Sequence, residues 1–310
     1  MRSQPGLRLA DADRERVHRI YEGFLRAGLD RLNHRNLRLP GNPASLMPYR
    51  YTSIAFDDQP VPGRALDIFM PAGKPRRHAI FMVHGGGWRQ GSRAQYHALM
   101  NALGKQGYIC GSTDYRLEGV DILTQIEDVR LGYCLFRQEL ATTAGERQVV
   151  AYGGSAGGHL AALLAMADPG ACGESVAASD SGWVRPAGAI LASAPATFEP
   201  WEDIFPGIWV SMQGIVGKPW ESDPEAYRRV SPIRHAGVGT PPVLLLDGAN
   251  EHMFPRELGL ALCERIRACG GRAERHEFPT AEHGFFYDVT RRPQQAAFAE
   301  VLRFLVSLES

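Results

Sequence analysis

Ser155 stands where the sequence changes from one pattern to another. The stretch "VVAYGGSAGGHLAALLA" (residues 149 to 165) begins as an apolar, β-branched run and ends as an alanine- and leucine-rich helical pattern. The glycines around the serine fit G-x-S-x-G, a sharp strand-to-helix turn that exposes a nucleophilic hydroxyl and aims the next N–H, that of Ala156, at an oxyanion. Serine between glycines is also common in flexible loops, so a nucleophile requires a base and an oxyanion site elsewhere in the chain.

A second glycine run, "HGGGW" (residues 84 to 88), follows the apolar stretch "AIFMVH". Glycines at 85, 86 and 87 let the main chain approach a ligand closely and donate N–H groups to it. Each such donor is worth about 3 kcal/mol when it faces a tetrahedral intermediate. A plain glycine-rich turn is the alternative, but the position ahead of the serine turn favours an oxyanion site. Phosphate binding is disfavoured, since neither G-x-G-x-x-G nor G-x-x-x-x-G-K-[ST] occurs.

Histidine is the usual base for a serine hydroxyl at neutral pH, and the chain has ten histidines. His283, in "TAEHGFFYD", lies in a loop between the last predicted strand and the last predicted helix, and we predict that it is the base. His84 belongs to the glycine motif. His159 follows the serine by one helical turn and is interpreted as packing or local hydrogen bonding. His252 is interpreted as solvent-facing and His276 as part of a strand.

The acid that orients this base should precede it in the order Ser…Asp/Glu…His. The loop after the strand "PVLLLDG" offers two carboxylates, Asp247 and Glu251. Asp247 ends the strand, whereas Glu251 lies further into the loop, where the chain can turn back toward the histidine loop. We predict Glu251, with Asp247 as the alternative.

These residues are embedded in a regular alternation of strand and helix patterns. The strands are "YTSIAF", "ALDIFM", "AIFMVH", "YICGSTDY", "QVVAYG", "AGAILAS", "PVLLLDG" and "AERHEF". The helices begin at about 92, 122, 156, 255 and 293, and the run "AIFMVH" is apolar enough for a strand buried on both faces. The alternation predicts an α/β fold with a mostly parallel sheet, helices on both faces and sites at the carboxyl ends of its strands.

Two segments stand apart from this alternation. Apolar residues at helical spacing between 11 and 32 predict an amphipathic helix, so residues 1–50 are interpreted as an N-terminal helical extension of a domain at 51–310. Residues from about 196 to 233 hold three of the five tryptophans. These rings are interpreted mostly as a small hydrophobic cluster, while a lid-like insertion lining the site is the functional alternative.

Composition narrows the function further. Lys plus Arg and Asp plus Glu number 34 each, so no excess of positive charge favours nucleic acid or an anionic membrane. No membrane span is expected, and without a signal-peptide pattern we expect a cytoplasmic protein, although a processed secreted form is compatible with the sequence. Five scattered cysteines predict reduced thiols. Neither a metal nor a cofactor is expected, and a homo-oligomer is compatible with the sequence.

The joint order of motifs resembles the α/β-hydrolase superfamily, in particular HGGG-type carboxylesterases related to hormone-sensitive lipase and to kynurenine formamidase. The likeness rests on "HGGGW", "TDYRL", "GGSAGGHLAALLA", "SPIRHAGVGTPPVLLLDGANE" and "EHGF", and covers residues from about 51 to the end. By position, Ser155 matches the nucleophile, His283 the base, and the amides of Gly86, Gly87 and Ala156 the oxyanion donors. Many relatives have aspartate where this chain has glutamate in the acid loop, and "TDYRL" is interpreted as structural.

The resemblance implies acyl transfer in two steps without a metal, with a small ester as the substrate partner. A serine carboxylesterase acting on short-chain, aryl or acetyl esters is the first hypothesis. An amide hydrolase such as an arylformamidase would use the same residues. A non-catalytic ligand receptor on the same fold is the third, and the intact serine, histidine and oxyanion motifs count against it.

Overall fold

The computed structural model describes residues 49–56, 63–176 and 182–309. The predicted N-terminal helix falls outside these residues. The strands are β1 (Tyr49–Ala55), β2 (Ala65–Pro71), β3 (His78–Val83), β4 (Ile109–Thr113), β5 (Gln148–Gly154), β6 (Gly188–Ala192), β7 (Val243–Asn250) and β8 (Ala273–Glu282). The helices are the short 3-10 helix η2 (Arg93–Tyr96) and the α-helices α2 (His97–Lys105), α3 (Ile122–Thr143), α4 (Ala156–Met166), α5 (Pro206–Val216), α6 (Pro224–Arg229), α7 (Pro232–His235), α8 (Arg256–Ala268) and α9 (Arg292–Ser307).

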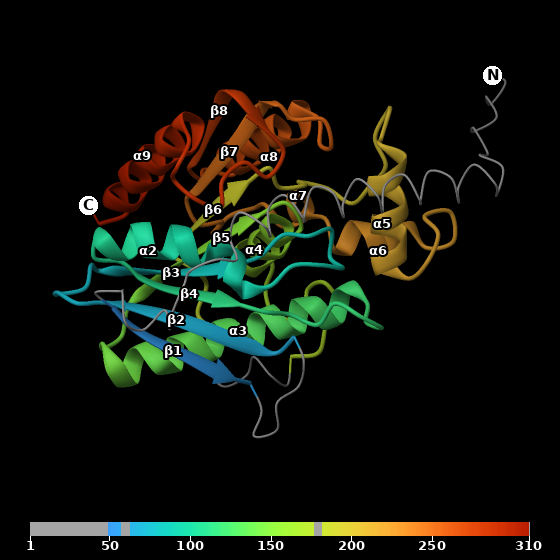
Figure 1. The fold of residues 1–310 in the computed structure, drawn as a ribbon. Helices are drawn as coiled ribbons and strands as arrows, with labels where there is room; N and C mark the ends of the chain where they lie inside the picture. Colours follow the sequence, from blue (N-terminus) through green and yellow to red (C-terminus); the bar gives the residue numbers. More distant parts are fainter. Residues whose placement is uncertain (1–48, 57–62, 177–181, 310) are drawn as a thin grey trace, which may run out of the picture.

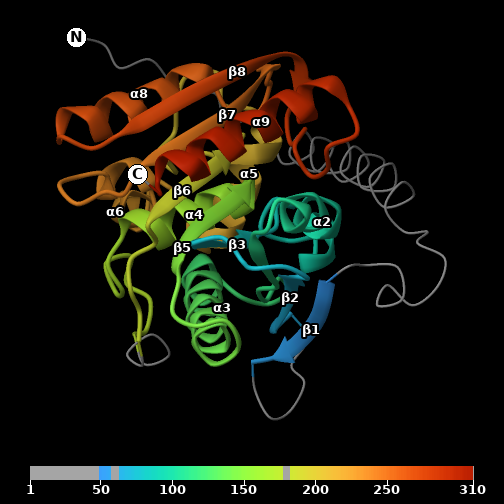
Figure 2. The same ribbon diagram turned by 90° about the vertical axis from the view of Figure 1, so that its left-hand side faces the viewer.

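The strands form one eight-stranded sheet in the order β1-β2-β4-β3-β5-β6-β7-β8. β1 and β2 pair antiparallel, β2 pairs antiparallel with β4, and the other neighbours are parallel. Figure 2 shows β1 at the bottom edge of the twisted sheet and β8 at the top. The mostly parallel α/β fold expected from the sequence is therefore confirmed. Its carboxyl strand ends gather at one edge, where the loops that carry the motifs lie.

Helices cover both faces of the sheet because every central strand is apolar on both sides. All six residues of β3 and all five of β6 are buried. One hydrophobic cluster joins the sheet to α3, α4 and α8, and a second joins the opposite face to α2 and α9. In Figure 1, α2 and α9 lie on the left, and α5 and α6 lie apart from them on the right.

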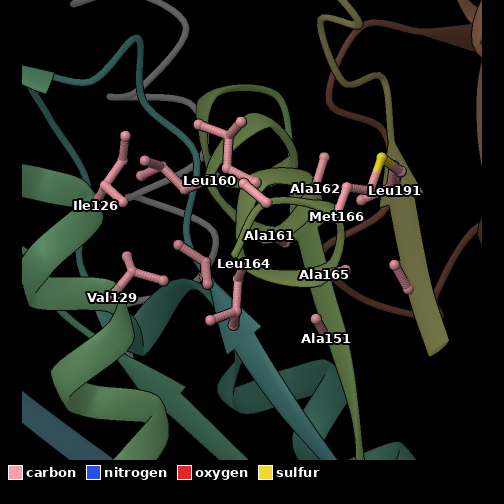
Figure 3. Close-up of a cluster of buried hydrophobic side chains, with 14 of the residues drawn as sticks. Ile126, Val129, Ala151, Leu160, Ala161, Ala162, Leu164, Ala165, Met166 and Leu191 are labelled. Carbon is pink, nitrogen blue, oxygen red and sulfur yellow. The ribbon is translucent and has the colours of Figure 1, made fainter. Parts of the chain in front are cut away.

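The helix that follows Ser155 is buried along its whole length. All eleven residues of α4 are buried, because α4 packs on β3, β5 and β6 and is flanked by α3 and α7. Figure 3 shows Leu160 and Leu164 of α4 facing Ile126 and Val129 of α3. Four of the helix's other residues are alanine and two are glycine, and these small residues let it pack closely on the sheet. Burying each leucine stabilises the folded state by about 2 kcal/mol, so α4 is held firmly and fixes the turn that precedes it.

The segment from 196 to 233, irregular in its sequence pattern, contains α5 and α6 and the start of α7 at 232. Trp209 and Trp220 both pack on the buried ring of Tyr227, at 5.6 and 5.4 Å between ring centroids. Trp201 instead packs on Phe254, at 6.2 Å. The small aromatic cluster expected from the sequence thus includes two of the three tryptophans, while the third lies against a loop of the site.

Candidate active site

Ser155 occupies the turn between β5 and α4. Its φ of 53° lies in the left-handed region, which is strained for a residue with a side chain. The turn is also crowded: a Cβ added to Gly153 would lie 2.1 Å from the carbonyl oxygen of Gly157. A Cβ on Gly157 would lie 2.0 Å from the carbonyl oxygen of Val83 at the end of β3. Glycine is therefore required on both sides of the serine for the turn to close.

Ser155, His283 and Glu251 form a continuous hydrogen-bonded chain. The serine Oγ lies 2.8 Å from Nε2 of His283, and Nδ1 of the same ring lies 2.8 Å from Oε2 of Glu251. A carboxylate only accepts hydrogen bonds, so Nδ1 carries the proton and Nε2 is left to accept from the serine hydroxyl. This is the arrangement that a serine nucleophile and its general base require.

The carboxylate of Glu251 is held by its own loop as well as by the histidine. Oε1 accepts the N–H of Met253 at 2.8 Å. Burial raises the pKa of Glu251, but hydrogen bonds and charge from His283, the Met253 amide and the Ser193 hydroxyl outweigh it and leave the pKa below its usual value. The acid is therefore ionised wherever the imidazole must be oriented.

Asp247, the alternative acid, has a different partner. Its Oδ2 accepts Nε of Arg275 on β8 at 2.7 Å. Burial raises its pKa, opposed by the guanidinium. The structure thus brings Glu251, and not Asp247, to the histidine. The cause is the pairing of β7 with β8, which continues past an irregularity to the pair Asn250 and Glu282. Glu251 and His283 are the residues that directly follow this pair.

The glycine loop after β3 lies beside the serine. A Cβ added to Gly85 would lie 3.3 Å from Cβ of Ser155. Gly86 and Gly87 have φ values of 129° and 60°, which glycine adopts readily. Ala156 is the first residue of α4, so its N–H has no partner within the helix. The three amides predicted as oxyanion donors therefore belong to two segments that flank the serine.

The "TDYRL" segment supports this loop from β4. The hydroxyl of Tyr115 donates to the carbonyl of His84 at 2.9 Å, and the two rings stack at 4.3 Å. Asp114 accepts the N–H of Arg93 at 2.7 Å. Arg116 makes two bonds of 2.8 Å to Asp128 of α3. These contacts agree with the structural role expected for the segment.

Four other histidines, all among the described residues, have different surroundings. His84 is buried, and burial lowers its pKa. His159 accepts the indole N–H of Trp88 at 3.3 Å and donates to the carbonyl of Val230 at 2.7 Å, in line with the local hydrogen bonding expected for it. His252 is exposed, with its ring centroid 6.4 Å from that of His283. His276 lies on β8, 3.5 Å from Glu300.

A cavity of about 600 Å³ lies next to the glycine loop. Arg89, whose N–H donates to the carbonyl of Gly86 at 3.2 Å, lines it together with residues 117–121 of the loop after β4. Gly214 and Ile215 of α5 also line the cavity. The insertion between β6 and β7 therefore contributes to this cavity, whose lining includes neither the serine, the histidine nor the predicted oxyanion donors.

Three residues of the site carried no recognisable sequence signal. Ser193, at the end of β6, has a φ of 47° and a hydroxyl that acts on Glu251. The ring of Phe254 lies 5.5 Å from that of His283, centroid to centroid, and its N–H reaches Glu251 at 3.4 Å. Tyr287 lies close to the glycine loop. Of the three, only Ser193 could have been found from the sequence, because it follows β6, the neighbour of the strand that leads to Ser155.

Within the described ranges, no cluster of three or more histidine, cysteine, aspartate or glutamate side chains could hold a metal ion. In the same residues, no helix has both the length and the apolarity to span a bilayer. The five cysteines are free thiols, as the sequence predicted, and four of them are buried.

The chain is similar to several proteins that are known as esterases. The chain is 30% identical to esterase LipC of Mycobacterium tuberculosis, over 72% of this chain and 57% of LipC. It is 28% identical to esterase LipQ of the same organism, over 90% of this chain and 66% of LipQ. The chain thus spans less than two thirds of the length of these curated relatives.

Solved structures show the same fold. Esterase 2 of Thermogutta terrifontis is 26% identical, with a TM-score of 0.66 over 88% of this chain and 96% of that one. It is known with butyrate bound, in a match of 25% identity, TM-score 0.68 and 83% and 94% coverage. Esterase B of Lactobacillus rhamnosis is 20% identical, with a TM-score of 0.74 over 96% of both chains.

The BD-FAE family matches residues 66–266, from the start of β2 nearly to the end of α8. This range contains the glycine loop, the serine turn and the acid, while the histidine follows it. The α/β-hydrolase resemblance of the sequence is confirmed by the match and by the shared fold. The chain therefore belongs to the BD-FAE family.

Proposed function

We propose that this protein is a serine carboxylesterase for small esters, with Ser155 as nucleophile, His283 as base and Glu251 as acid. The observation that carries the proposal is the unbroken chain of two 2.8 Å contacts that joins the three side chains. The glycine loop beside the serine supports it, since hydrolysis of an ester also needs donors for the oxyanion.

In the proposed reaction, Oγ of Ser155 attacks the carbonyl carbon while Nε2 of His283 takes the hydroxyl proton. The amides of Gly86, Gly87 and Ala156 stabilise the negative oxygen of the tetrahedral intermediate. Nε2 then protonates the departing alcohol, and an acyl-enzyme remains. Water attacks this ester with Nε2 again as base, and the acid leaves as the serine regains its proton.

One observation favours small substrates. Trp201 and Phe254 place an aromatic wall beside the histidine ring, which limits the room for a long chain. Butyrate and propionate, the acids bound to the Thermogutta esterase, have the chain length that we propose for the acyl group here.

The test is a panel of p-nitrophenyl esters from acetate to decanoate, run beside N-formylkynurenine. We expect kcat/KM to be highest for acetate or butyrate and to fall with longer chains. Ser155→Ala should lose activity by about 10⁴-fold or more at an unchanged melting temperature. Turnover of the formamide alone would replace the esterase by an amide hydrolase, and a Ser155→Ala variant with full activity would exclude this site altogether.

A further inference from the structure

The side chain of Tyr287 lies against the glycine loop, although it belongs to no motif. Tyr287 follows His283 by four residues, on the loop between β8 and α9. A Cβ added to Gly85 would lie 2.6 Å from the Tyr287 hydroxyl oxygen and 3.3 Å from Cβ of Ser155. Only the space of that absent side chain separates the phenol from the serine.

The same ring also fills the space beside two other glycines of the site. A Cβ on Gly154, which precedes the serine, would lie 3.4 Å from the Tyr287 hydroxyl oxygen. A Cβ on Gly284, which follows the histidine, would lie 3.5 Å from Cε2 of Tyr287. The Tyr287 side chain therefore lies beside three glycines. Gly85 precedes a proposed oxyanion donor, Gly154 precedes the proposed nucleophile, and Gly284 follows the proposed base.

Tyr287 is held from behind by two further tyrosines. Its ring stacks on that of Tyr96 at 5.2 Å, and Tyr96 packs edge-on against Tyr152 at 5.1 Å. The hydroxyl of Tyr152 donates to the carbonyl of Phe286 at 2.8 Å, which fixes the chain next to Tyr287. The orientation of the Tyr287 ring is thus set by β5, by η2 and by its own loop.

The hydroxyl of Tyr287 is a neutral group. Burial raises its pKa to about 12, despite the lowering effect of the neighbouring Tyr96 hydroxyl. It therefore keeps its proton at neutral pH, and it acts neither as a base nor as a charged group in the reaction. What it contributes is packing and hydrogen bonding.

We propose that Tyr287 is a positioning residue, whose hydroxyl holds the glycine loop against the serine turn and so sets the distance from the oxyanion donors to the reacting carbonyl. This inference rests on the proposed esterase function. Oxyanion donors need to lie about 2.7–3.1 Å from the position of the developing charge, so a shift of the loop away from it slows the reaction. Removing the hydroxyl would leave a void beside Gly85 into which the loop can move.

The experiment is Tyr287→Phe, assayed with p-nitrophenyl butyrate. The rate is expressed per reactive serine, counted by titration with paraoxon to completion, so that unfolded molecules do not contribute. We expect kcat to fall by about 10- to 100-fold and KM to change by less than about twofold, because the loop acts on the transition state. Inhibition by phenylboronic acid, which forms a tetrahedral adduct on the serine, should weaken in parallel with kcat.

Two further variants separate positioning from general packing. Tyr108→Phe removes another buried phenol hydroxyl, at the far end of β4, and should leave kcat and boronate inhibition unchanged. Tyr287→Leu should lose as much kcat as Tyr287→Phe, with a further loss only in melting temperature. The proposal is overturned if Tyr287→Phe keeps wild-type kcat, or if kcat falls while boronate inhibition does not weaken.

The outcome is distinguishable from failure of the esterase function itself. Turnover by the wild type and its loss in Ser155→Ala establish the function, whatever Tyr287→Phe does. If the wild type hydrolyses no ester, the proposed function is wrong. If the wild type is active and Tyr287→Phe has the same kcat, only the positioning role is wrong.

Discussion

At the scale of single residues, two carboxylates near the end of β7 differ in the side chain that each one contacts. Asp247 neutralises Arg275 across the β7–β8 pair, and Glu251 meets the imidazole of His283. Burial opposes ionisation of both, but hydrogen bonds to Glu251 lower its pKa, whereas the pKa of Asp247 remains raised. The residue with the lowered pKa is the one suited to orienting a histidine and stabilising its cation.

Glu251→Gln should therefore lower kcat by about 10²- to 10⁴-fold, since the amide no longer supplies the charge that fixes the tautomer and stabilises the imidazolium. Asp247→Asn should keep kcat within about fivefold and lower the melting temperature, because Arg275 loses a charged partner. Steady-state kinetics and thermal unfolding of both variants measure this. The reverse ranking of kcat would assign the acid to Asp247.

At the scale of elements, a buried histidine links the site to the insertion. His159, on α4, joins Trp88 of the glycine motif to Val230, the C-cap residue of α6. The ring must be neutral for this, because Nδ1 accepts from an indole N–H. Burial lowers its pKa to about 3, so the folded protein keeps the neutral form well below the usual titration of histidine.

This link predicts an acid-sensitive stability. Between about pH 6.5 and 3 the unfolded chain binds a proton that folded His159 does not, so the free energy of unfolding falls as pH is lowered, by about 1.4 kcal/mol per pH unit. Glutamine in place of His159 does not bind a proton in either the folded or the unfolded chain. Urea unfolding at pH 7, 6, 5 and 4 should show a shallower loss for His159→Gln than for the wild type. Parallel pH profiles would contradict the assignment.

At the scale of the whole molecule, a buried ion pair fastens the chain between α4 and β6 to α3. Arg130 and Glu174 are almost fully buried, with Nε and Oε1 2.7 Å apart. The guanidinium also donates to the carbonyl of Ala167 at 3.1 Å, and the carboxylate accepts the N–H of Cys172 at 3.1 Å. The pair thus joins the residues that follow α4, from 167 to 174, to α3.

Glu174→Gln should lower the free energy of unfolding by about 3 kcal/mol, because it leaves a buried guanidinium without a countercharge. Lys218→Gln, which breaks the exposed pair with Asp223, is the matched control and should cost less than about 1 kcal/mol. Denaturant unfolding compares the two, and kcat/KM should be unchanged in both. Equal stabilities for the two variants would show that the buried pair contributes little.

The sequence by itself determined the strand and helix order, the serine turn, the glycine loop and the histidine. These features are local, since an apolar run, a pair of glycines at a tight turn and a helical repeat each act over a few residues. Within the described residues, the predicted strands and helices accordingly agree with the structure to within a few residues, and the largest difference among the strands is β8, which ends at Glu282 rather than at Phe278. The short helices of the insertion were not predicted, because their packing rather than their pattern stabilises them.

Only the tertiary structure decided which groups meet. The choice between Glu251 and Asp247 follows from the register at the end of β7 and β8, where pairing resumes after an irregularity. The place of Tyr287 depends on three loops and two other tyrosines packing together. The Glu251–His283 contact joins residues 32 positions apart, and the Tyr96–Tyr287 contact joins residues 191 positions apart, so no local propensity encodes either of them. The sequence thus indicated Ser155 and His283, and the packing of the sheet decided that Glu251, and not Asp247, lies against the histidine and that Tyr287 lies beside the glycine loop.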